Sequence, residues 1–249
     1  MIRRDGTVFG GAGPVVVGHR GGRGEGWSAE NTQAAFARAA DEGARAIELD
    51  VRTCASGEVV VFHDETLTRM TAGADTRRVA DVRWFDLARV VLAGGARVLL
   101  LSEVLASSRD RGVAVNVELK HDVPSRIALA RAVASTIAAA SDTEVLASSF
   151  DPRILALFAA FAPRVRRALI TSPAQREASL LHAIAPRAAL FAIHAERRQT
   201  SPELVARWKR RGLRVGVWTV NDPREARDLV RLGVDFVITD HPGEILAGL

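Results

Sequence analysis

The chain has 249 residues, 48% of them hydrophobic, and a formal net charge of +5 from 34 Lys and Arg against 29 Asp and Glu. This composition suffices for a sizeable core, and the small excess of positive charge is spread along the chain without the basic stripe that binds nucleic acid. No apolar run reaches the ~18 residues that a membrane-spanning helix needs, which argues against membrane insertion.

The amino-terminal segment and the cysteine content bear on the compartment. Residues 1–20 carry charge but no apolar stretch followed by a cleavage site, which argues against a secretory signal. Cys54 is the only cysteine, so no disulfide can form within the chain. We therefore expect a soluble, cytoplasmic protein.

Short runs rich in Val and Ile alternate with longer amphipathic stretches, a pattern typical of parallel strands joined by crossover helices. The predicted strands are Val15–Gly18, Ala46–Val51, Val113–Leu119, Glu144–Ser148, Arg167–Ile170, Ala189–Ile193, Arg214–Val220 and Phe236–Thr239. The predicted helices are Asn31–Glu42, Ser125–Ala140, Pro152–Ala162, Arg176–Ile184, Pro202–Arg211, Pro223–Leu232 and a last one from Pro242. Proline stands at the start of several of these helices and glycine follows others, as helix termini favour.

Eight alternating strands favour a closed TIM (β/α)8 barrel over an open doubly wound sheet. The run Val59–Phe62 follows the second strand too closely for a crossover helix, and the turn at residues 55–57 predicts that it folds back as a hairpin arm. The stretch Asp64–Leu105 is the least regular part of the chain. The sequence contains no recognisable linker, fixed repeat or low-complexity tail, so we expect a single domain over residues 1–249.

Polar residues cluster where the predicted strands end, which is where such barrels carry their active sites. Glu48 and Asp50 alternate along one strand and therefore share its inward face, and Glu118 has the same placement on its own strand. Three buried carboxylates would repel one another unless a cation held them, and Mg²⁺ or Ca²⁺ takes such oxygen ligands. The alternative is that each acid pairs with one of the many arginines.

The chain has six histidines, of which His19 and His63 each end an apolar run beside a charged residue. Two histidines flanking a metal could serve as general acid and base, because imidazole titrates near neutral pH. His194 and His241 stand at predicted strand ends with a weaker case. The other two are interpreted as structural or solvated, namely His121 and His182.

Cations lie at the same predicted edge. Arg20 and Lys120 could bind phosphate oxygens, and Lys120 is notable because Lys209 is the only other lysine. Arg20 could equally be a surface residue in so arginine-rich a chain. Trp218, at the end of the seventh strand, is either a core residue or a pocket wall.

Several ordered motifs resemble the glycerophosphodiester phosphodiesterase family, a group of phospholipase C-like phosphodiesterase barrels. The matching segments are 19–21, 30–32, 35–36, 43–44, 47–51, 61–67 with Arg69, 118–120, 149–150, 217–221, 233–235 and 239–242. They run in order from about Val15 to the carboxyl terminus, which makes the resemblance specific. Ala29 and Met70 depart from the usual motifs, the segment 98–105 follows its motif only loosely, and the loop Arg23–Ser28 with Trp27 is unusual.

The resemblance implies metal-dependent hydrolysis of glycerophosphodiesters, small molecules of glycerol and lipid metabolism, to an alcohol and sn-glycerol 3-phosphate. It implies His19 and His63 as the acid–base pair, without assigning which is which. It further implies the divalent metal ligands Glu48, Asp50 and Glu118, the phosphate-binding pair Arg20 and Lys120, and the pocket residues Phe150 and Trp218.

Two other functions stay open at this point. A lysophospholipase D or sphingomyelinase D-like enzyme would share the barrel and the histidines, and an apolar groove near Trp27 and Trp218 would favour it. A catalytically silent protein that binds phosphodiesters would retain the fold without turnover. The sequence also leaves open the alcohol group, the metal, and whether water or a glycerol hydroxyl attacks first to give a cyclic phosphate.

Overall fold

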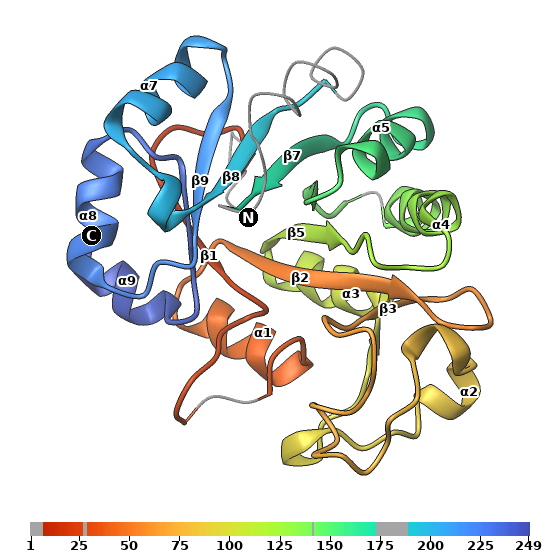
Figure 1. Cartoon of the computed structure of the whole chain (residues 1–249). Helices are drawn as coiled ribbons and strands as arrows, with labels where there is room; N and C mark the ends of the chain where they lie inside the picture. Colours follow the sequence, from red (N-terminus) through yellow and green to blue (C-terminus); the bar gives the residue numbers. More distant parts are fainter. Residues whose placement is uncertain (1–6, 27–28, 141, 173–188) are drawn as a thin grey trace.

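A computed structural model describes residues 7–26, 29–140, 142–172 and 189–249. Within these ranges, parallel strands close into an eight-stranded barrel with helices around it (Figure 1). The barrel strands are β1 (Val15–Gly18), β2 (Ala46–Thr53), β5 (Ala114–Leu119), β6 (Val145–Ser149), β7 (Arg166–Thr171), β8 (Ala192–Glu196), β9 (Arg214–Trp218) and β10 (Phe236–Thr239). β1 pairs with both β10 and β2, which closes the ring. The predicted TIM (β/α)8 barrel is confirmed.

Beyond the barrel rim, β2 continues into an antiparallel arm. β3 (Val59–Val61) pairs with the end of β2, and β4 (Leu99–Leu100) adds to β3. The predicted hairpin is therefore confirmed. The segment between β3 and β4 holds only short pieces, namely the 3-10 helices η1 (Val79–Asp81) and η2 (Ala93–Gly95) and the single turn α2 (Trp84–Leu87).

Several helices around the barrel begin where the local sequence predicts. Pro152, Pro202, Pro223 and Pro242 each occupy a first helical turn, where a missing N–H costs nothing. The helices are α1 (Gln33–Asp41), α3 (Leu101–Arg111), α4 (Arg126–Ala139), α5 (Pro152–Phe161), α7 (Pro202–Arg210), α8 (Pro223–Arg231) and α9 (Pro242–Gly248), with the 3-10 turn η3 (Arg197–Gln199) after β8. Among the described residues, none of these helices combines the length and the apolar character that crossing a membrane requires.

Most element boundaries differ from the prediction by a few residues, and two elements differ more. Helix α3 was not predicted, although Leu101, Val104 and Leu105 are buried at helical spacing and Gly112 ends the helix in the left-handed region. Strand β8 begins at Ala192 rather than at Ala189, because the backbone at Ala189 has a φ of 42° and belongs to a turn. The predicted helix 176–184 lies outside the described residues.

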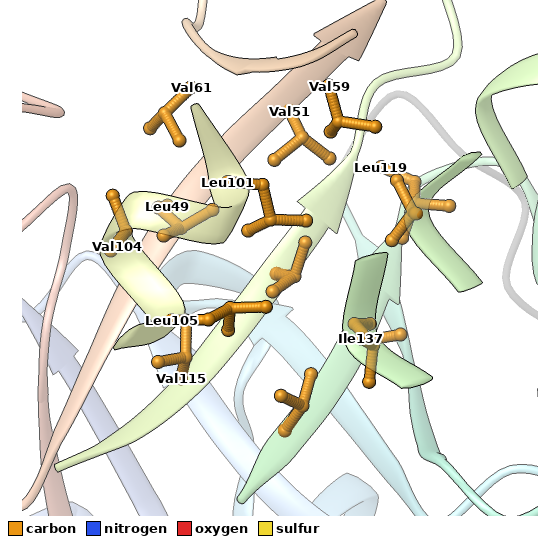
Figure 2. Close-up of a cluster of buried hydrophobic side chains, with 14 of the residues drawn as sticks. Leu49, Val51, Val59, Val61, Leu101, Val104, Leu105, Val115, Leu119 and Ile137 are labelled. Atoms are coloured by element: carbon orange, nitrogen blue, oxygen red, sulfur yellow. The ribbon is translucent and has the colours of Figure 1, made fainter. Parts of the chain in front are cut away.

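Alternation along the strands separates two cores. Outward side chains of β2 and β5, including Leu49, Val51 and Val115, pack against Leu101 and Leu105 of α3 (Figure 2). Inward side chains fill the amino-terminal half of the barrel, and this interior cluster contains Val15, Val17, Leu146, Phe236 and Phe9. The apolar filling leaves the carboxyl-terminal half of the barrel for polar side chains.

Candidate active site

A cavity of about 260 Å³ opens at the carboxyl ends of the barrel strands. It is lined by all but one of the residues proposed from the sequence, namely His19, Arg20, Glu48, His63, Glu118, Lys120, Phe150 and Trp218. The exception is Asp50, which is fully buried beside the cavity. The fold therefore brings residues from five barrel strands and the hairpin arm to one place.

The three carboxylates predicted as metal ligands lie together. Glu48 and Asp50 come from β2, and Glu118 comes from β5 directly opposite Asp50 in the register. One oxygen from each lies within 4.8 Å of the others. Burial and the neighbouring charges of Asp50 and Glu118 raise the pKa of Glu48 well above its usual value. Burial likewise raises the pKa of Glu118, although Lys120 opposes this shift.

Asp50 is held in the ionised state by its neighbours. Burial opposes its ionisation, but Lys120 and Arg20 keep the pKa of Asp50 well below its usual range. The Lys120 Nζ lies 3.3 Å from Asp50 Oδ1 and 2.8 Å from Glu118 Oε1, and the Asn31 amide donates to Asp50 Oδ2 at 2.9 Å. Asn31 precedes α1 at a φ of 58°, a conformation that asparagine tolerates.

This donor set fits a hard divalent cation. The carboxylates are oxygen ligands of the kind that Mg²⁺ and Ca²⁺ prefer, and they converge on a space that one ion could fill. Burial first, and then the neighbouring carboxylates, raise the pKa values of Glu48 and Glu118, and the nearby cations Arg20 and Lys120 offset only part of these shifts. A bound cation would supply the missing charge.

His19 is oriented by a carboxylate from the other end of the chain. Its Nδ1 lies 2.8 Å from Asp240 Oδ1, and its Nε2 faces Glu48 at 3.9 Å. Asp240 is fixed in turn by Arg23, whose Nε donates at 2.8 Å, and by the amide of Asn221 at 3.0 Å. Burial lowers the pKa of His19, and Asp240 opposes part of that shift.

His63 forms a second pair of the same kind. Its Nδ1 lies 2.6 Å from Asp64 Oδ1, and Arg69 Nε donates to the other Asp64 oxygen at 2.6 Å. Burial lowers the pKa of His63, whereas Asp50 raises it. Both histidines therefore have Nδ1 committed to a carboxylate, which leaves Nε2 for chemistry in the cavity.

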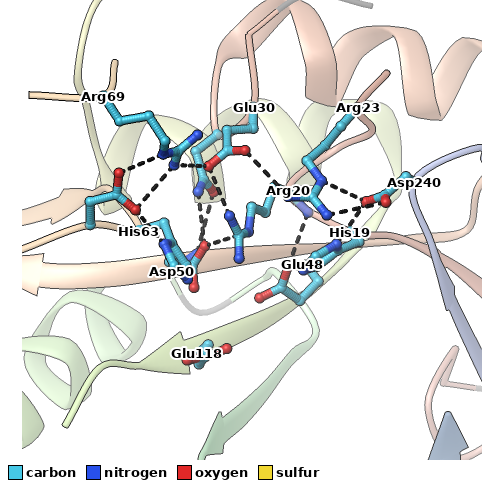
Figure 3. A network of polar contacts seen from close by, with 12 residues as sticks. His19, Arg20, Arg23, Glu30, Glu48, Asp50, His63, Arg69, Glu118 and Asp240 are labelled. Atoms are coloured by element: carbon cyan, nitrogen blue, oxygen red, sulfur yellow. Dashed lines mark hydrogen bonds and ion pairs between the residues drawn. The ribbon is translucent and has the colours of Figure 1, made fainter. Parts of the chain in front are cut away.

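Glu30 joins the two histidine pairs through arginines (Figure 3). Its Oε1 lies 2.6 Å from Arg69 Nη2 and 2.8 Å from Arg20 Nη1, and its Oε2 lies 3.6 Å from Arg23 Nη1. Arg69 leads to Asp64 and His63, while Arg23 leads to Asp240 and His19. Both histidines thus belong to one ionic network centred on Glu30.

The remaining proposed residues form the cavity wall. Arg20 is largely buried, so it is not the surface arginine that its sequence context allowed. Its backbone N–H donates to Glu48 at 3.0 Å and its Nε lies 3.1 Å from Asp50. The rings of Phe150 and Trp218 meet edge to face at 5.5 Å. Trp218 is both a cavity wall and a neighbour of the barrel core.

The other described histidines lie in different surroundings. His121 is exposed beside Phe150, and His241 caps α9 with its ring against Gly24. His194 was predicted at a strand end, but the later start of β8 places it inside the strand, with its ring in the barrel. His182 lies outside the described residues.

Gly21 serves packing rather than ligand approach. A Cβ on Gly21 would meet the Ala35 carbonyl carbon at 2.7 Å, and the backbone there has a φ of 86°. Glycine is therefore required where the strand-end loop crosses α1.

Several residues of the site received no role from the sequence, namely Arg23, Glu30, Asn31, Asp64, Arg69, Asn116, Asn221 and Asp240. Most stand inside the recognised motifs, next to residues that did receive a role. Several of their partners, however, lie far away in sequence, such as Asp240 for Arg23 and Glu30 for Arg69. A single sequence contains no signal for such pairings.

Known proteins resemble this chain over nearly its whole length. The model of the glycerophosphoryl diester phosphodiesterase family matches residues 19–244. A glycerophosphodiester phosphodiesterase of Caldanaerobacter subterraneus is 30% identical over 240 residues, which cover 93% of this chain and 96% of that protein.

Solved structures agree with this match. A glycerophosphodiester phosphodiesterase from Agrobacterium tumefaciens is 27% identical with a TM-score of 0.78, covering 94% of this chain and 99% of that one. A phosphodiesterase from Oleispira antarctica, solved with its product sn-glycerol-3-phosphate, has a TM-score of 0.83 at 24% identity and covers 94% and 96% of the two chains. At that identity, the second likeness speaks for the fold alone.

Proposed function

The chain belongs to the glycerophosphoryl diester phosphodiesterase family, and from this membership we propose that its barrel-mouth cavity hydrolyses glycerophosphodiesters to an alcohol and sn-glycerol 3-phosphate. One observation carries the proposal for this site. Two histidines, each bound to a carboxylate, line the same cavity as a cluster of acidic residues.

Glu48, Asp50 and Glu118 would hold one divalent cation, Mg²⁺ or Ca²⁺, as their oxygen ligands suggest. When bound, such an ion neutralises phosphodiester charge and polarises phosphorus. Arg20 and Lys120, at the same end of the cavity, would bind phosphate oxygens. Phe150 and Trp218 would contact the glycerol or alcohol part through their rings.

The two histidines would move the protons. With Nδ1–H donating to Asp240 or Asp64, each neutral ring presents Nε2 as a base. One ring takes the proton of the nucleophile as its oxygen bonds to phosphorus. The other, protonated, donates to the alcohol oxygen as the P–O bond breaks. The nucleophile is water, or a glycerol hydroxyl whose cyclic phosphate water then opens.

Release of sn-glycerol 3-phosphate from glycerophosphocholine tests this function. We expect turnover with Mg²⁺ or Ca²⁺, its loss in chelator, and a fall of at least about 100-fold in His19→Ala and His63→Ala. His121→Ala removes an exposed histidine beside Phe150 and serves as the matched control.

Two results would overturn the proposal in different ways. Turnover confined to a long-chain lysophosphatidylcholine would make the protein a lysophospholipase D-type enzyme. Tight binding of glycerophosphocholine without turnover under any metal would make it a silent binding protein.

A further inference from the structure

One inward position deeper than Asp50 and Glu118, at the register position of Glu48, the floor of the cavity has polar but uncharged side chains. Asn116 and His194 line it together with the apolar side chains of Ile170 and Ile238. Asn116 is two residues before Glu118 on β5, which puts it one inward position deeper in the barrel. The proposed mechanism uses neither Asn116 nor His194.

Both polar residues of the floor are buried and have side-chain atoms without a hydrogen-bond partner among the described residues. Asn116 is 1% exposed and His194 is 2% exposed. The Asn116 Oδ1 and both ring nitrogens of His194 have no hydrogen-bond partner among the described residues. Leaving a buried polar atom unpaired costs about 1–3 kcal/mol, so three such atoms around one cavity indicate that something else satisfies them.

The fold makes room for the histidine ring. A Cβ on Gly216 would lie 2.6 Å from His194 Cδ2, so a larger residue on β9 would displace the ring. Phe236 packs edge to face with the ring at 5.8 Å, and the Trp218 indole N–H donates to the His194 carbonyl at 3.1 Å. The ring is therefore held in place by packing alone while its nitrogens stay unpaired.

The chemistry of the floor suits hydroxyl groups better than an anion. Burial lowers the pKa of His194 to about 3, so the ring is neutral under ordinary conditions. A neutral imidazole offers one donor and one acceptor, and the Asn116 oxygen adds an acceptor. A hydroxyl group gives and takes one hydrogen bond in the same way, whereas phosphate would require the cations, which lie nearer the mouth.

We propose that Asn116 and His194 bind the two free hydroxyls of the substrate's glycerol moiety, with Ile170 and Ile238 against its carbon chain. This assignment rests on the proposed function and adds a specificity determinant to it. It orients the substrate with its diol at the floor, its phosphate at the level of the carboxylates, and its alcohol group toward solvent. Diesters without the diol would leave the floor unpaired and bind less well.

A binding experiment tests the floor without relying on turnover. Calorimetry in Mg²⁺ or Ca²⁺ compares sn-glycerol 3-phosphate with propyl phosphate, which keeps the phosphate and lacks both hydroxyls. We expect the wild type to prefer glycerol 3-phosphate by about tenfold or more. His194→Leu and Asn116→Leu should each reduce that preference about fivefold to tenfold, and His194→Gln, which keeps a donor and an acceptor, should retain more of it.

Thr171→Val is the matched control. This substitution also removes a buried unpaired polar atom, but Thr171 does not line the cavity, whereas the preceding residue Ile170 does. It should leave the preference unchanged. If His194→Leu fails to fold by circular dichroism, Asn116→Leu decides the question with the ring intact.

An unchanged preference in the floor variants would overturn the assignment and leave a floor that binds only water. That outcome, combined with normal hydrolysis of glycerophosphocholine, would leave the proposed function standing. If the wild type does not hydrolyse glycerophosphocholine but the floor variants abolish the preference for glycerol 3-phosphate, the floor assignment stands and the proposed function fails.

Discussion

Each candidate catalytic histidine is oriented by a carboxylate on its Nδ1, but the two carboxylates differ in their surroundings. Asp240 is nearly buried and held by Arg23 and Asn221, whereas Asp64 is more exposed and adjoins His63 in sequence. A carboxylate fixed on several sides restricts the ring that it binds more tightly. We therefore expect His19 to depend more strongly on its partner than His63 does.

Asp240→Asn tests this positioning role. We expect kcat for glycerophosphocholine to fall about tenfold to 100-fold with little change in KM, because the ring loses its fixed tautomer. Burial lowers the pKa of His19 and Asp240 raises it, so removing the carboxylate must lower that pKa further.

The pH profile of Asp240→Asn then separates the two roles of His19. A shift of the acid limb to lower pH identifies His19 as the base, and a shift of the alkaline limb to lower pH identifies it as the acid. Asp228→Asn, on an exposed ion pair with Arg231, should leave both limbs in place. Equal behaviour of the two variants would contradict a positioning role.

Glu30→Gln tests the ionic network. The side chain of Glu30 is 8% exposed and pairs with Arg20 and Arg69, so its loss leaves buried positive charge without compensation. We expect the free energy of unfolding in urea to fall by about 2 kcal/mol, with a loss of activity, since both histidine partners lose support. Glu65→Gln, whose partner Arg78 is half-exposed, should cost about 0.5 kcal/mol or less. Similar costs for both would mean that the network adds no stability.

At the scale of elements, the loop after β1 is fitted to the start of α1. Gly21→Ala would combine a φ of 86° with a Cβ 2.7 Å from the Ala35 carbonyl carbon. We expect it to lower the free energy of unfolding by about 2–3 kcal/mol and to reduce activity, because His19 and Arg20 immediately precede it.

Gly73→Ala is the control for backbone strain alone. Its φ is 84°, but nothing lies within 4 Å of the added Cβ. We expect a cost of about 1 kcal/mol and normal activity. Thermal unfolding of both variants would distinguish the cases, and equal losses would show that contact with α1 is unimportant.

The elements also show where local patterns suffice. Period-two alternation predicted β2 and the shared inward face of Glu48 and Asp50, because alternation is a property of neighbouring residues. The same reasoning misplaced β8, since a turn at Ala189 delayed the strand. The delay changed the interpretation of His194 from a strand-end residue to part of the barrel floor.

At the scale of the whole molecule, closing the barrel concentrates negative charge. The pKa values of Glu48 and Glu118 are raised in the folded protein, so the folded state binds protons more tightly than the unfolded chain. Stability from these groups is fully present below about pH 4.5 and is lost as pH rises through their folded pKa values. The pKa values of Asp50 and Asp240 are lowered in the folded protein. The stability that these two groups contribute is therefore lost only as pH falls below about 4.

In chelator, we therefore expect Glu48 and Glu118 to contribute a decline of the Tm as pH rises above about 4.5. His19, His63 and His194 contribute in the opposite direction up to about pH 6.5, because their pKa values are lowered in the folded state. Excess Mg²⁺ or Ca²⁺ should raise the Tm most at neutral pH, because the ion binds the ionised carboxylates of the folded state. Glu48→Gln should flatten the decline in chelator and weaken the response to the ion. A wild-type Tm that does not respond to either ion at neutral pH would argue against the metal site.

The sequence by itself determined the barrel, its hairpin arm and several of the residues that line the mouth. Strand alternation, prolines in the first turn of helices and short motifs such as residues 47–51 depend only on neighbouring residues, so a single sequence is enough to recognise them. Tertiary structure alone decided which residues pair across the site. Asp240 reaches His19 across 221 positions because β10 closes the ring against β1. Glu30 joins both histidine pairs because its carboxylate contacts Arg69 and Arg23, which come from different segments of the chain. Such contacts depend on barrel closure, and no periodicity in the sequence records them.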